Sequence, residues 1–429
     1  MLSALFLCAA AQAPAPPAWL ERELDGLVKL YEELHAAPEL SFQEANSAAR
    51  LAQVLRDAGY VVTEKIGGHG VAGVLENGPG PTLLIRCDMD ALPIVEETGL
   101  SFASKVQAPG EGGGKVGVMH ACGHDVHMTV WSGVARRLAE RRADWSGRLI
   151  LIAQPAEERG AGARAMLEDD LYARVGKPDF CLALHVKAEL PAGVIGSVPG
   201  YALANSDSVD ILVRGRGGHG STPELTHDPV TLAARIVVGL QSIVSREVAA
   251  QEAAVITVGS IHGGTKHNII PNEVKLQLTV RSYTPAIRDR LLAAIERTAL
   301  NEARAAGFPE DLLPQVDLIE SITATYNDPA LVTRADAAIV RALGEGSVVA
   351  TPPVMGGEDF GLYGPAAQAP SYMFWLGVTE PARWQAARDH GEAVPSVHTS
   401  RFTPQSRPSI RTGVLAMTAV ALDLLAPRR

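Results

Sequence analysis

The sequence has few cysteines, no long apolar run and no excess of basic residues, and each absence excludes a class of protein. Four cysteines among 429 residues are too few and too scattered for a disulfide scaffold. No apolar run of 18 or more residues is present, so nothing is typical of a membrane-spanning helix. The formal net charge is −10, which argues against a nucleic-acid-binding surface, because such surfaces are basic. A chain that is 47% hydrophobic can instead bury a large core in about two or three domains.

The first thirteen residues differ from the rest of the chain. Leu2–Ala11 is a short apolar run, Ala11-Gln12-Ala13 fits a cleavage site of small residues, and three prolines follow within residues 14–17. No Lys or Arg precedes Arg22, so the basic segment that usually opens an export signal is missing. We predict that residues 1–13 are a signal peptide and that the protein is exported, to the periplasm or out of the cell. The alternative is a disordered N-terminus on a cytoplasmic protein.

Two helices are predicted next. Apolar residues recur at helical spacing from Leu20 to Leu34, and Ala37-Pro38 ends that pattern. Ser41 followed three residues later by Glu44 is the pattern of a capping box, in which both side chains bond the first N–H groups of a helix. We therefore predict a second helix that begins here and ends near Gly59.

The stretch Met119–His127 holds three histidines, a cysteine and an aspartate. Core packing does not require this density, whereas thiolate and imidazole are ligands that zinc and related metals prefer. Cys122 and His124, at the mouth of a predicted helix, are therefore candidate metal ligands. His120 and His127 fit better as neighbours of the site or as helix-surface residues than as ligands. The alternative is a buried free cysteine beside a hydrogen-bonded histidine.

Polar side chains follow three predicted strands: Asp88 and Asp90 after 82–87, Glu157 and Glu158 after 148–153, and His185 after 180–184. Ligands bind at the carboxyl ends of strands in open α/β sheets, so we expect these side chains to gather there. Consecutive side chains in extended backbone point in opposite directions, so one glutamate can bind metal while the other acts as general base. The aspartates are expected to orient the histidine ligands. Taken singly, each feature could be a turn, a solvated loop or a surface histidine.

The pattern changes near Ser206. From there to residue 320 we predict strand, helix, two strands, helix and strand, which is the βαββαβ order of a ferredoxin-like domain. The α/β pattern then resumes, which indicates a discontinuous catalytic domain. We predict a catalytic domain of residues 14–200 and 316–429, with a mixed sheet flanked by helices, and an inserted lid of residues 201–315.

The predicted lid offers three polar candidates. The glycine-rich loop 215–220 exposes His219, which suits transition-state stabilisation; the loop lacks the Lys-Ser/Thr ending of a nucleotide-binding motif. Arg281 ends a predicted strand, where its guanidinium could bind a substrate carboxylate, and Asn268 lies in a nearby loop. The alternatives are a surface ion pair for the arginine and turn formation for the asparagine.

Taken together, these stretches resemble the M20 metallopeptidase family, in particular its amidohydrolase branch of hippurate hydrolases, auxin-conjugate hydrolases and N-acyl-amino-acid deacetylases. The resemblance covers essentially the whole chain after residue 20. The stretches that carry it are residues 34–42, 88–93, 119–127, 154–158, 217–220, 268–271 and 355–360.

The resemblance implies a role for each candidate residue. It implies that two divalent metal ions are bound by Cys122, His124, Glu158, His185 and His398. It implies that Glu157 is the general base on a metal-bridging water, that His219 holds the scissile carbonyl, often across a dimer, and that Asn268 and Arg281 contact substrate. Only the resemblance singles out His398, because a lone loop histidine is otherwise uninformative. Three departures from the family pattern, Cys87, Glu224 and Gln405, remove neither a ligand nor the base.

We therefore expect a dinuclear metal-dependent amidohydrolase that cleaves N-acyl amino acids. The metals are expected to be zinc or manganese, with cobalt or nickel as alternatives. The resemblance also implies a homodimer or higher oligomer formed through the lid. Two other functions stay open: a carboxypeptidase or dipeptidase of the same family, and a metal-dependent binding protein without catalysis, which the presence of Glu157 disfavours.

Overall fold

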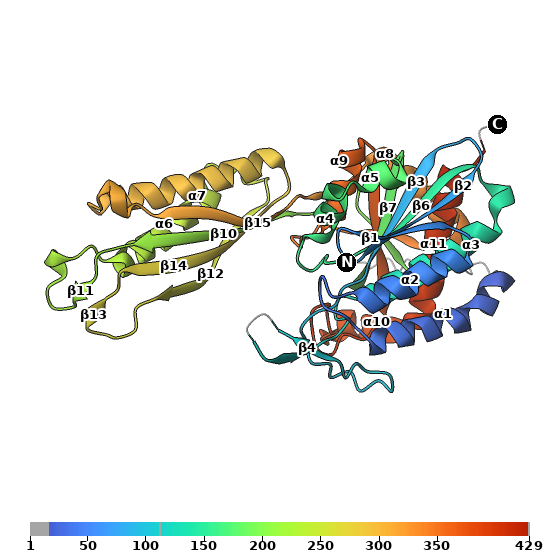
Figure 1. Ribbon diagram of the computed structural model, residues 1–429, viewed down its shortest axis with the longest axis horizontal. Helices are drawn as coiled ribbons and strands as arrows, with labels where there is room; N and C mark the ends of the chain where they lie inside the picture. The colour runs from blue at the N-terminus through green and yellow to red at the C-terminus, as the bar shows by residue number, and fades with distance from the viewer. Residues whose placement is uncertain (1–16, 111–112, 428–429) are drawn as a thin grey trace, which may run out of the picture. The chain divides into compact units, whose positions relative to one another are not determined.

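The computed structural model describes residues 17–110 and 113–427, which form two compact units (Figure 1). The first comprises the described residues up to Ala202, Tyr326–Pro352 and the residues from Asp359 onward. The second comprises Leu203–Thr325 and Pro353–Glu358. The predicted fold class, a discontinuous α/β domain with an inserted βαββαβ domain, is confirmed. The predicted signal peptide lies outside the described residues and stays a prediction.

The first unit is built on an eight-stranded mixed sheet with the order β1-β2-β6-β3-β7-β18-β8-β17. Strands β6, β3, β7 and β18 run parallel, so their carboxyl ends share one edge of the sheet. The strand bounds are β1 Val61–Ile66, β2 Gly70–Asn77, β3 Thr82–Asp88, β6 Gly147–Gln154, β7 Phe180–Pro191, β8 Ile195–Ser197, β17 Val348–Ala350 and β18 Ser371–Thr379.

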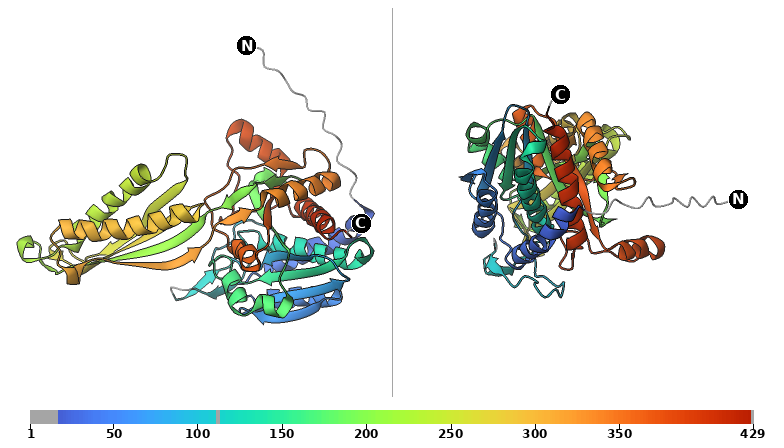
Figure 2. Two further views of the ribbon diagram at one scale, coloured as in Figure 1. Left: turned by 90° about the horizontal axis from the view of Figure 1, so that it is seen from above. Right: turned by 90° about the vertical axis from the view of Figure 1, so that its right-hand side faces the viewer.

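Helices cover this sheet because its strands are apolar on both faces. Figures 1 and 2 show the helices beside the sheet. Leu149, Leu151 and Ala153 belong to the core that contains α1, α2, α3 and α11, whereas the alternate residues Ile150 and Ile152 are buried on the opposite face. The helix bounds are α1 Ala18–Ala36, α2 Ala45–Asp57, α3 His124–Glu140, α4 Gly162–Glu168, α5 Leu171–Val175, α8 Pro329–Leu343, α9 Tyr363–Ala367, α10 Pro381–His390 and α11 Ser406–Leu424.

Close packing of α3 against α11 fixes the helix that begins at the predicted metal ligands. A Cβ at Gly133 would lie 2.7 Å from the side chain of Val414, so glycine permits this approach. Trp131 is 2% exposed, and its indole N–H donates to the carbonyl of Ile85 (3.3 Å). These contacts hold α3 against the sheet, and its first residue is His124.

The second unit is a four-stranded antiparallel sheet, β12-β14-β10-β15, with two helices. The bounds are β10 Asn205–Arg214, α6 Pro229–Glu247, β12 Ala254–Gly263, β14 Glu273–Ser282, α7 Pro285–Ala305 and β15 Gln315–Ile322. Asp228 and Thr284 cap the two helices and a proline follows each cap, as helix starts favour. From the sequence we predicted that the inserted unit ends at residue 315. In the structure this stretch of the inserted unit extends to Thr325, because β15 pairs with β10.

Short elements complete the two units: β4 Gln107–Pro109, β5 Lys115–Gly117, β9 Gly200–Leu203, β11 Gly218–His219, β13 Ile269–Ile270 and β16 Thr325–Asn327. Within the described part of the chain, no helix has both the length and the apolar character needed to cross a bilayer.

Candidate metal centre

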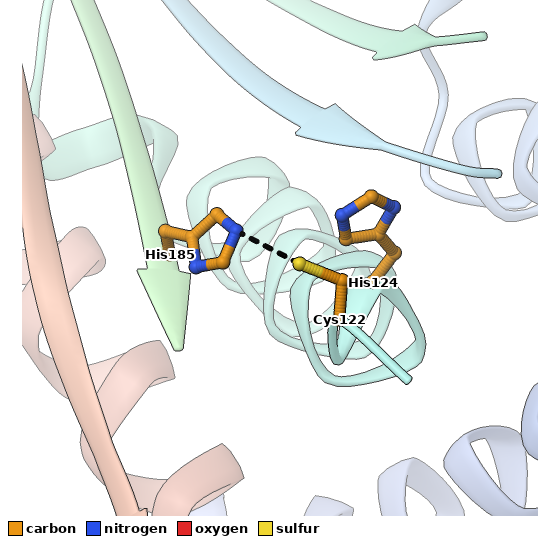
Figure 3. Close-up of side chains that lie close together, drawn as sticks. All are labelled: Cys122, His124 and His185. Carbon is orange, nitrogen blue, oxygen red and sulfur yellow. Dashed lines mark hydrogen bonds between the residues drawn. The ribbon is translucent and has the colours of Figure 1, made fainter. Parts of the chain in front are cut away.

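Two candidate ligands lie at the start of α3 and a third lies on β7. Gly123 has a φ of 77°, and a Cβ there would lie 2.6 Å from the side chain of Val186, so glycine allows this turn against β7. Cys122 and His124 flank the turn. Cys122 Sγ lies 3.4 Å from His185 Nε2 (Figure 3). The donor atoms of Cys122, His124 and His185 all lie within 4.8 Å of one another.

A C-terminal loop brings His398 to the same place. His398 Nε2 lies 3.2 Å from Cys122 Sγ and 3.5 Å from Glu158 Oε2. Its backbone N–H donates to the carbonyl of Ala121 (2.8 Å), which ties the loop to the chain beside Cys122. Its φ of 63° lies in the left-handed region that histidine seldom adopts. Tertiary contacts therefore unite residues that are far apart in the sequence.

The predicted ligands fit a divalent cation. Beyond the group of Figure 3, two overlapping groups of possible ligand atoms include Glu158: Cys122 with Glu158 and His398, and His124 with Glu157 and Glu158. Among the described residues, no hydrogen bond reaches the buried atoms His124 Nε2 and Glu158 Oε1, which a cation would satisfy. Burial raises the pKa of the Cys122 thiol and raises the pKa of Glu158 to about 7. Metal binding would therefore displace protons from both groups.

Hydrogen bonds orient the rings of the two candidate histidine ligands in the first group. His124 Nδ1 lies 2.8 Å from the backbone carbonyl oxygen of Asp90, and His185 Nδ1 lies 2.8 Å from that of Val186. A carbonyl oxygen only accepts, so each Nδ1 carries the hydrogen and donates it. In the neutral form of each ring the lone pair therefore lies on Nε2, toward the donor cluster, as a metal-binding imidazole requires. Burial alone would lower the pKa of His124, but Asp88, Asp90 and Glu158 raise it to about 10, so metal binding would displace a proton from this ring as well.

The other two histidines of the 119–127 stretch belong to none of these three groups, although His127 forms a further group with Asp88 and His124. His127 Nε2 accepts the N–H of Val186 (2.9 Å), so Nδ1 holds the proton and donates to Asp88 Oδ1 (2.6 Å). Both ring nitrogens of His127 are thus in use. His120 is 2% exposed, and burial lowers its pKa to about 4. It is buried within the first unit rather than on a helix surface.

Asp90 organises the two glutamates through their backbone. Its Oδ1 accepts the N–H of Glu157 (3.1 Å) and its Oδ2 accepts the N–H of Glu158 (3.0 Å). Ser41 Oγ also donates to Oδ2 (2.6 Å). His124 Nδ1 donates to the backbone carbonyl of Asp90 at 2.8 Å and also lies 3.4 Å from Asp90 Oδ1. Asp90 therefore combines two positioning contacts that strand-end spacing alone does not reveal.

Asp88 is held by a buried charged network that the sequence reasoning missed. Arg86 is 2% exposed and donates to Asp88 Oδ2 (2.6 Å), to Gln154 Oε1 (2.9 Å) and to Asp359 Oδ1 (3.2 Å). Burial alone would raise the pKa of Asp88, but His124, His127 and Arg86 hold it well below its usual range. An arginine inside the apolar strand 82–87 was the available signal for this network.

A second buried network joins α1 to the N-terminus of α3. His35 Nδ1 lies 2.7 Å from Asp125 Oδ2, and His35 Nε2 lies 3.0 Å from Glu96 Oε1. Burial alone would lower the pKa of His35, but the hydrogen bonds to Asp125 and Glu96 raise it to about 9 from an ordinary value of 6.5. The imidazolium therefore links two buried carboxylates next to the candidate ligand His124.

This network predicts a loss of stability at alkaline pH. Because the pKa of His35 is raised on folding, its contribution is fully present below about pH 6.5 and is lost as the pH rises through about 9. The loss should approach about 3 kcal/mol of unfolding free energy, at about 1.4 kcal/mol per pKa unit. Urea titrations between pH 6 and pH 10 measure it. The decline should be much smaller in His35→Gln, and an equal decline in both proteins contradicts the assignment.

The predicted lid residues lie in the second unit. The pair β11–β13 places His219 opposite Ile269, directly after Asn268. The N–H of Ser221 donates to His219 Nδ1 (3.1 Å), so the neutral imidazole carries its hydrogen on Nε2. Arg281 lies on β14, opposite Ser206 of β10, with its Nε donating to Thr279 Oγ1 (3.0 Å). His219 and Asn268 are thus neighbours, and Arg281 is on a different strand of the same unit.

Comparison with known proteins identifies one family, two relatives and one solved structure to which this chain is similar. The family described as peptidase family M20/M25/M40 matches residues 84–400. N-acetylcysteine deacetylase of Bacillus subtilis (strain 168) is 34% identical over 360 residues, covering 83% of this chain and 90% of that protein. Thermostable carboxypeptidase 1 of Saccharolobus solfataricus is 34% identical over 413 residues, covering 94% of this chain and 95% of that protein. The crystal structure of a dinuclear metal-binding M20 peptidase from Bacillus subtilis aligns with a TM-score of 0.75 and 29% identity, over 94% of this chain and 99% of that one.

Proposed function

The chain belongs to peptidase family M20/M25/M40 and is a hydrolase, and from this premise we propose that it hydrolyses the amide bond of N-acyl amino acids. One observation carries the proposal: the three donor groups of the candidate centre overlap, because each pair of groups shares one residue, Cys122, His124 or Glu158, and Glu157 belongs to one of them. Overlapping donor groups suit two neighbouring ions, as in the dinuclear relative. The N-acetylcysteine deacetylase supports an N-acyl substrate.

We assign Cys122, His124, Glu158, His185 and His398 as the ligands of two divalent ions. The chemistry that such ions supply is polarisation of the amide carbonyl and acidification of water. Zinc suits the thiolate and imidazoles, and manganese, cobalt and nickel are the other candidates.

We assign the proton transfers to Glu157. Its side chain is 8% exposed, and its Oε2 lies 3.7 Å from His124 Nε2, within the donor cluster. From there Oε2 can take a proton from the attacking water and return it to the leaving nitrogen.

We assign His219 and Arg281 to the substrate. The Nε2–H of a neutral His219 can donate to the oxyanion that forms at the carbonyl carbon, in this chain or in a partner chain. Arg281 can bind the substrate carboxylate with two parallel hydrogen bonds, and Asn268 contacts the substrate beside His219. A homodimer formed through the second unit is part of this proposal.

A carboxypeptidase is the second candidate, because the relative with that activity covers 94% of this chain at the same identity as the deacetylase. The two activities share the chemistry and differ in what lies on the acyl side of the scissile bond.

The test is amine release from a panel of N-acetyl amino acids, N-benzoyl amino acids and dipeptides, each with zinc, manganese, cobalt or nickel. We expect N-acyl amino acids to be cleaved fastest. Their carboxamide analogues should react about 10-fold to 100-fold more slowly, because a charge-assisted hydrogen bond contributes about 1.5–3 kcal/mol. Faster cleavage of dipeptides would favour the carboxypeptidase, and no amine release with any metal would favour a binding protein.

A further inference from the structure

We propose that Glu44 is a positioning residue that fixes the catalytic carboxylate Glu157 through the backbone of Ala156, an inference that rests on the proposed function. Glu44 directly precedes α2 and is 0% exposed. The capping-box pattern predicted that its side chain would bond the start of α2 together with Ser41. The structure contradicts this: the side chain of Glu44 makes no cap bond to α2, Ser41 donates to Asp90, and Glu39 accepts the first N–H groups of the helix instead.

The carboxylate of Glu44 holds two residues of unusual backbone conformation. Its Oε1 accepts the N–H of Ala156 (2.8 Å) and the N–H of Phe42 (2.8 Å). Ala156 has a φ of 50° and Phe42 a φ of 62°, both in the left-handed region that costs free energy for residues other than glycine. Such a conformation persists only where the surroundings enforce it, and one buried oxygen enforces both.

Ala156 matters because it turns the chain from β6 into the two glutamates. Its carbonyl accepts the N–H groups of Ala161 (3.2 Å) and Gly162 (3.1 Å). Three successive N–H groups are therefore held by buried carboxylates: that of Ala156 by Glu44, and those of the two glutamates by Asp90. Without Glu44, the N–H of Ala156 would be buried without a partner, and the left-handed turn would relax.

The second carboxylate oxygen of Glu44 indicates which replacement preserves this function. Oε2 is buried, and no hydrogen bond reaches it among the described residues. Burial, followed by the nearby Asp90, raises the pKa of Glu44 to about 7. A neutral amide can therefore replace the carboxyl, because glutamine keeps the oxygen that accepts both N–H groups.

The test compares Glu44→Ala with Glu44→Gln. For each variant, kcat and KM are measured with the N-acyl amino acid that the parent cleaves fastest, and Co²⁺ affinity is measured by absorption spectroscopy. Loss of a residue that supports metal ligands typically costs about 10-fold to 100-fold in metal affinity or activity. We expect that loss in kcat and Co²⁺ affinity for Glu44→Ala with KM little changed, and values within about threefold of the parent for Glu44→Gln. Adding Ala156→Gly to Glu44→Ala should recover part of the loss, because glycine adopts this φ without strain.

Glu39→Ala is the matched control. Its carboxylate also accepts two backbone N–H groups, those of Asn46 (3.0 Å) and Ser47 (2.8 Å) of α2, and the side-chain amide of Asn46 (2.7 Å). We expect it to lower the melting temperature with little change in kcat. Equal kcat and Co²⁺ affinity in Glu44→Ala and the parent, or equal damage from Glu44→Gln and Glu44→Ala, would overturn the proposal. If the parent cleaves no substrate, the Co²⁺ comparison still decides it, which separates its failure from that of the proposed function.

Discussion

Glu157→Gln is expected to lower kcat by about 100-fold to 10,000-fold, the range typical of a lost general base. Glutamine has nearly the same shape but cannot accept a proton at neutral pH. Its backbone N–H still reaches Asp90 Oδ1, so the fold and the candidate ligands should be preserved. Steady-state kinetics with an N-acyl amino acid, together with metal analysis of the same preparation, measures both quantities. KM should change little, because the loss falls on the chemical step.

The control is Glu345→Gln, an exposed glutamate in the turn after α8. It should leave kcat and metal content unchanged. A Glu157→Gln protein that keeps the parent rate with full metal content would show that the proton is moved by another group. If Glu157→Gln instead lost its metal, Glu157 would have to be reassigned as a ligand.

The second large effect is expected from metal removal. Chelation should abolish hydrolysis and destabilise the protein, because it leaves buried donors such as His124 Nε2 and Glu158 Oε1 without partners. When free metal exceeds its dissociation constant a thousandfold, the stabilisation is about 4 kcal/mol. Thermal melts with and without chelator measure this, and zinc or manganese added back should restore both activity and melting temperature.

His124→Ala should remove most of the metal-dependent stabilisation, whereas His390→Ala should keep it. His390 is the matched control because it lies at the exposed end of α10. The assignment fails if His124→Ala is stabilised by metal as much as the parent, or if chelator leaves the parent's melting temperature and activity unchanged.

The capping-box pattern shows where sequence reasoning reached its limit. Ser41 and Glu44 have the residue types and the spacing of a helix cap, and α2 does begin directly after them. Yet their side chains contact Asp90 and Ala156 instead. A local sequence pattern indicates only hydrogen-bond partners that are close along the chain. It carries no information on partners that come within reach only when the chain folds.

The sequence by itself determined the fold class and which side chains could bind a metal ion or transfer a proton. The spacing of apolar residues depends on neighbours along the chain, so the parallel strands and the βαββαβ insert could be predicted from it. The same holds for the polar residues at the ends of β3 and β6, because parallel strands end at one edge of a sheet. His185 was expected to follow a strand that ends at residue 184, but it lies within β7, which continues to Pro191 because it stays paired with β18.

Only the tertiary structure decided which of these groups meet and how they are oriented. His398 lies next to Cys122 although its loop is remote in the sequence. Both ring nitrogens of His127 are hydrogen-bonded, to Val186 and Asp88. Asp90 accepts the backbone N–H groups of the two glutamates. The physical reason is that hydrogen bonds act over about 3 Å, so such choices depend on packing and register set by the whole fold.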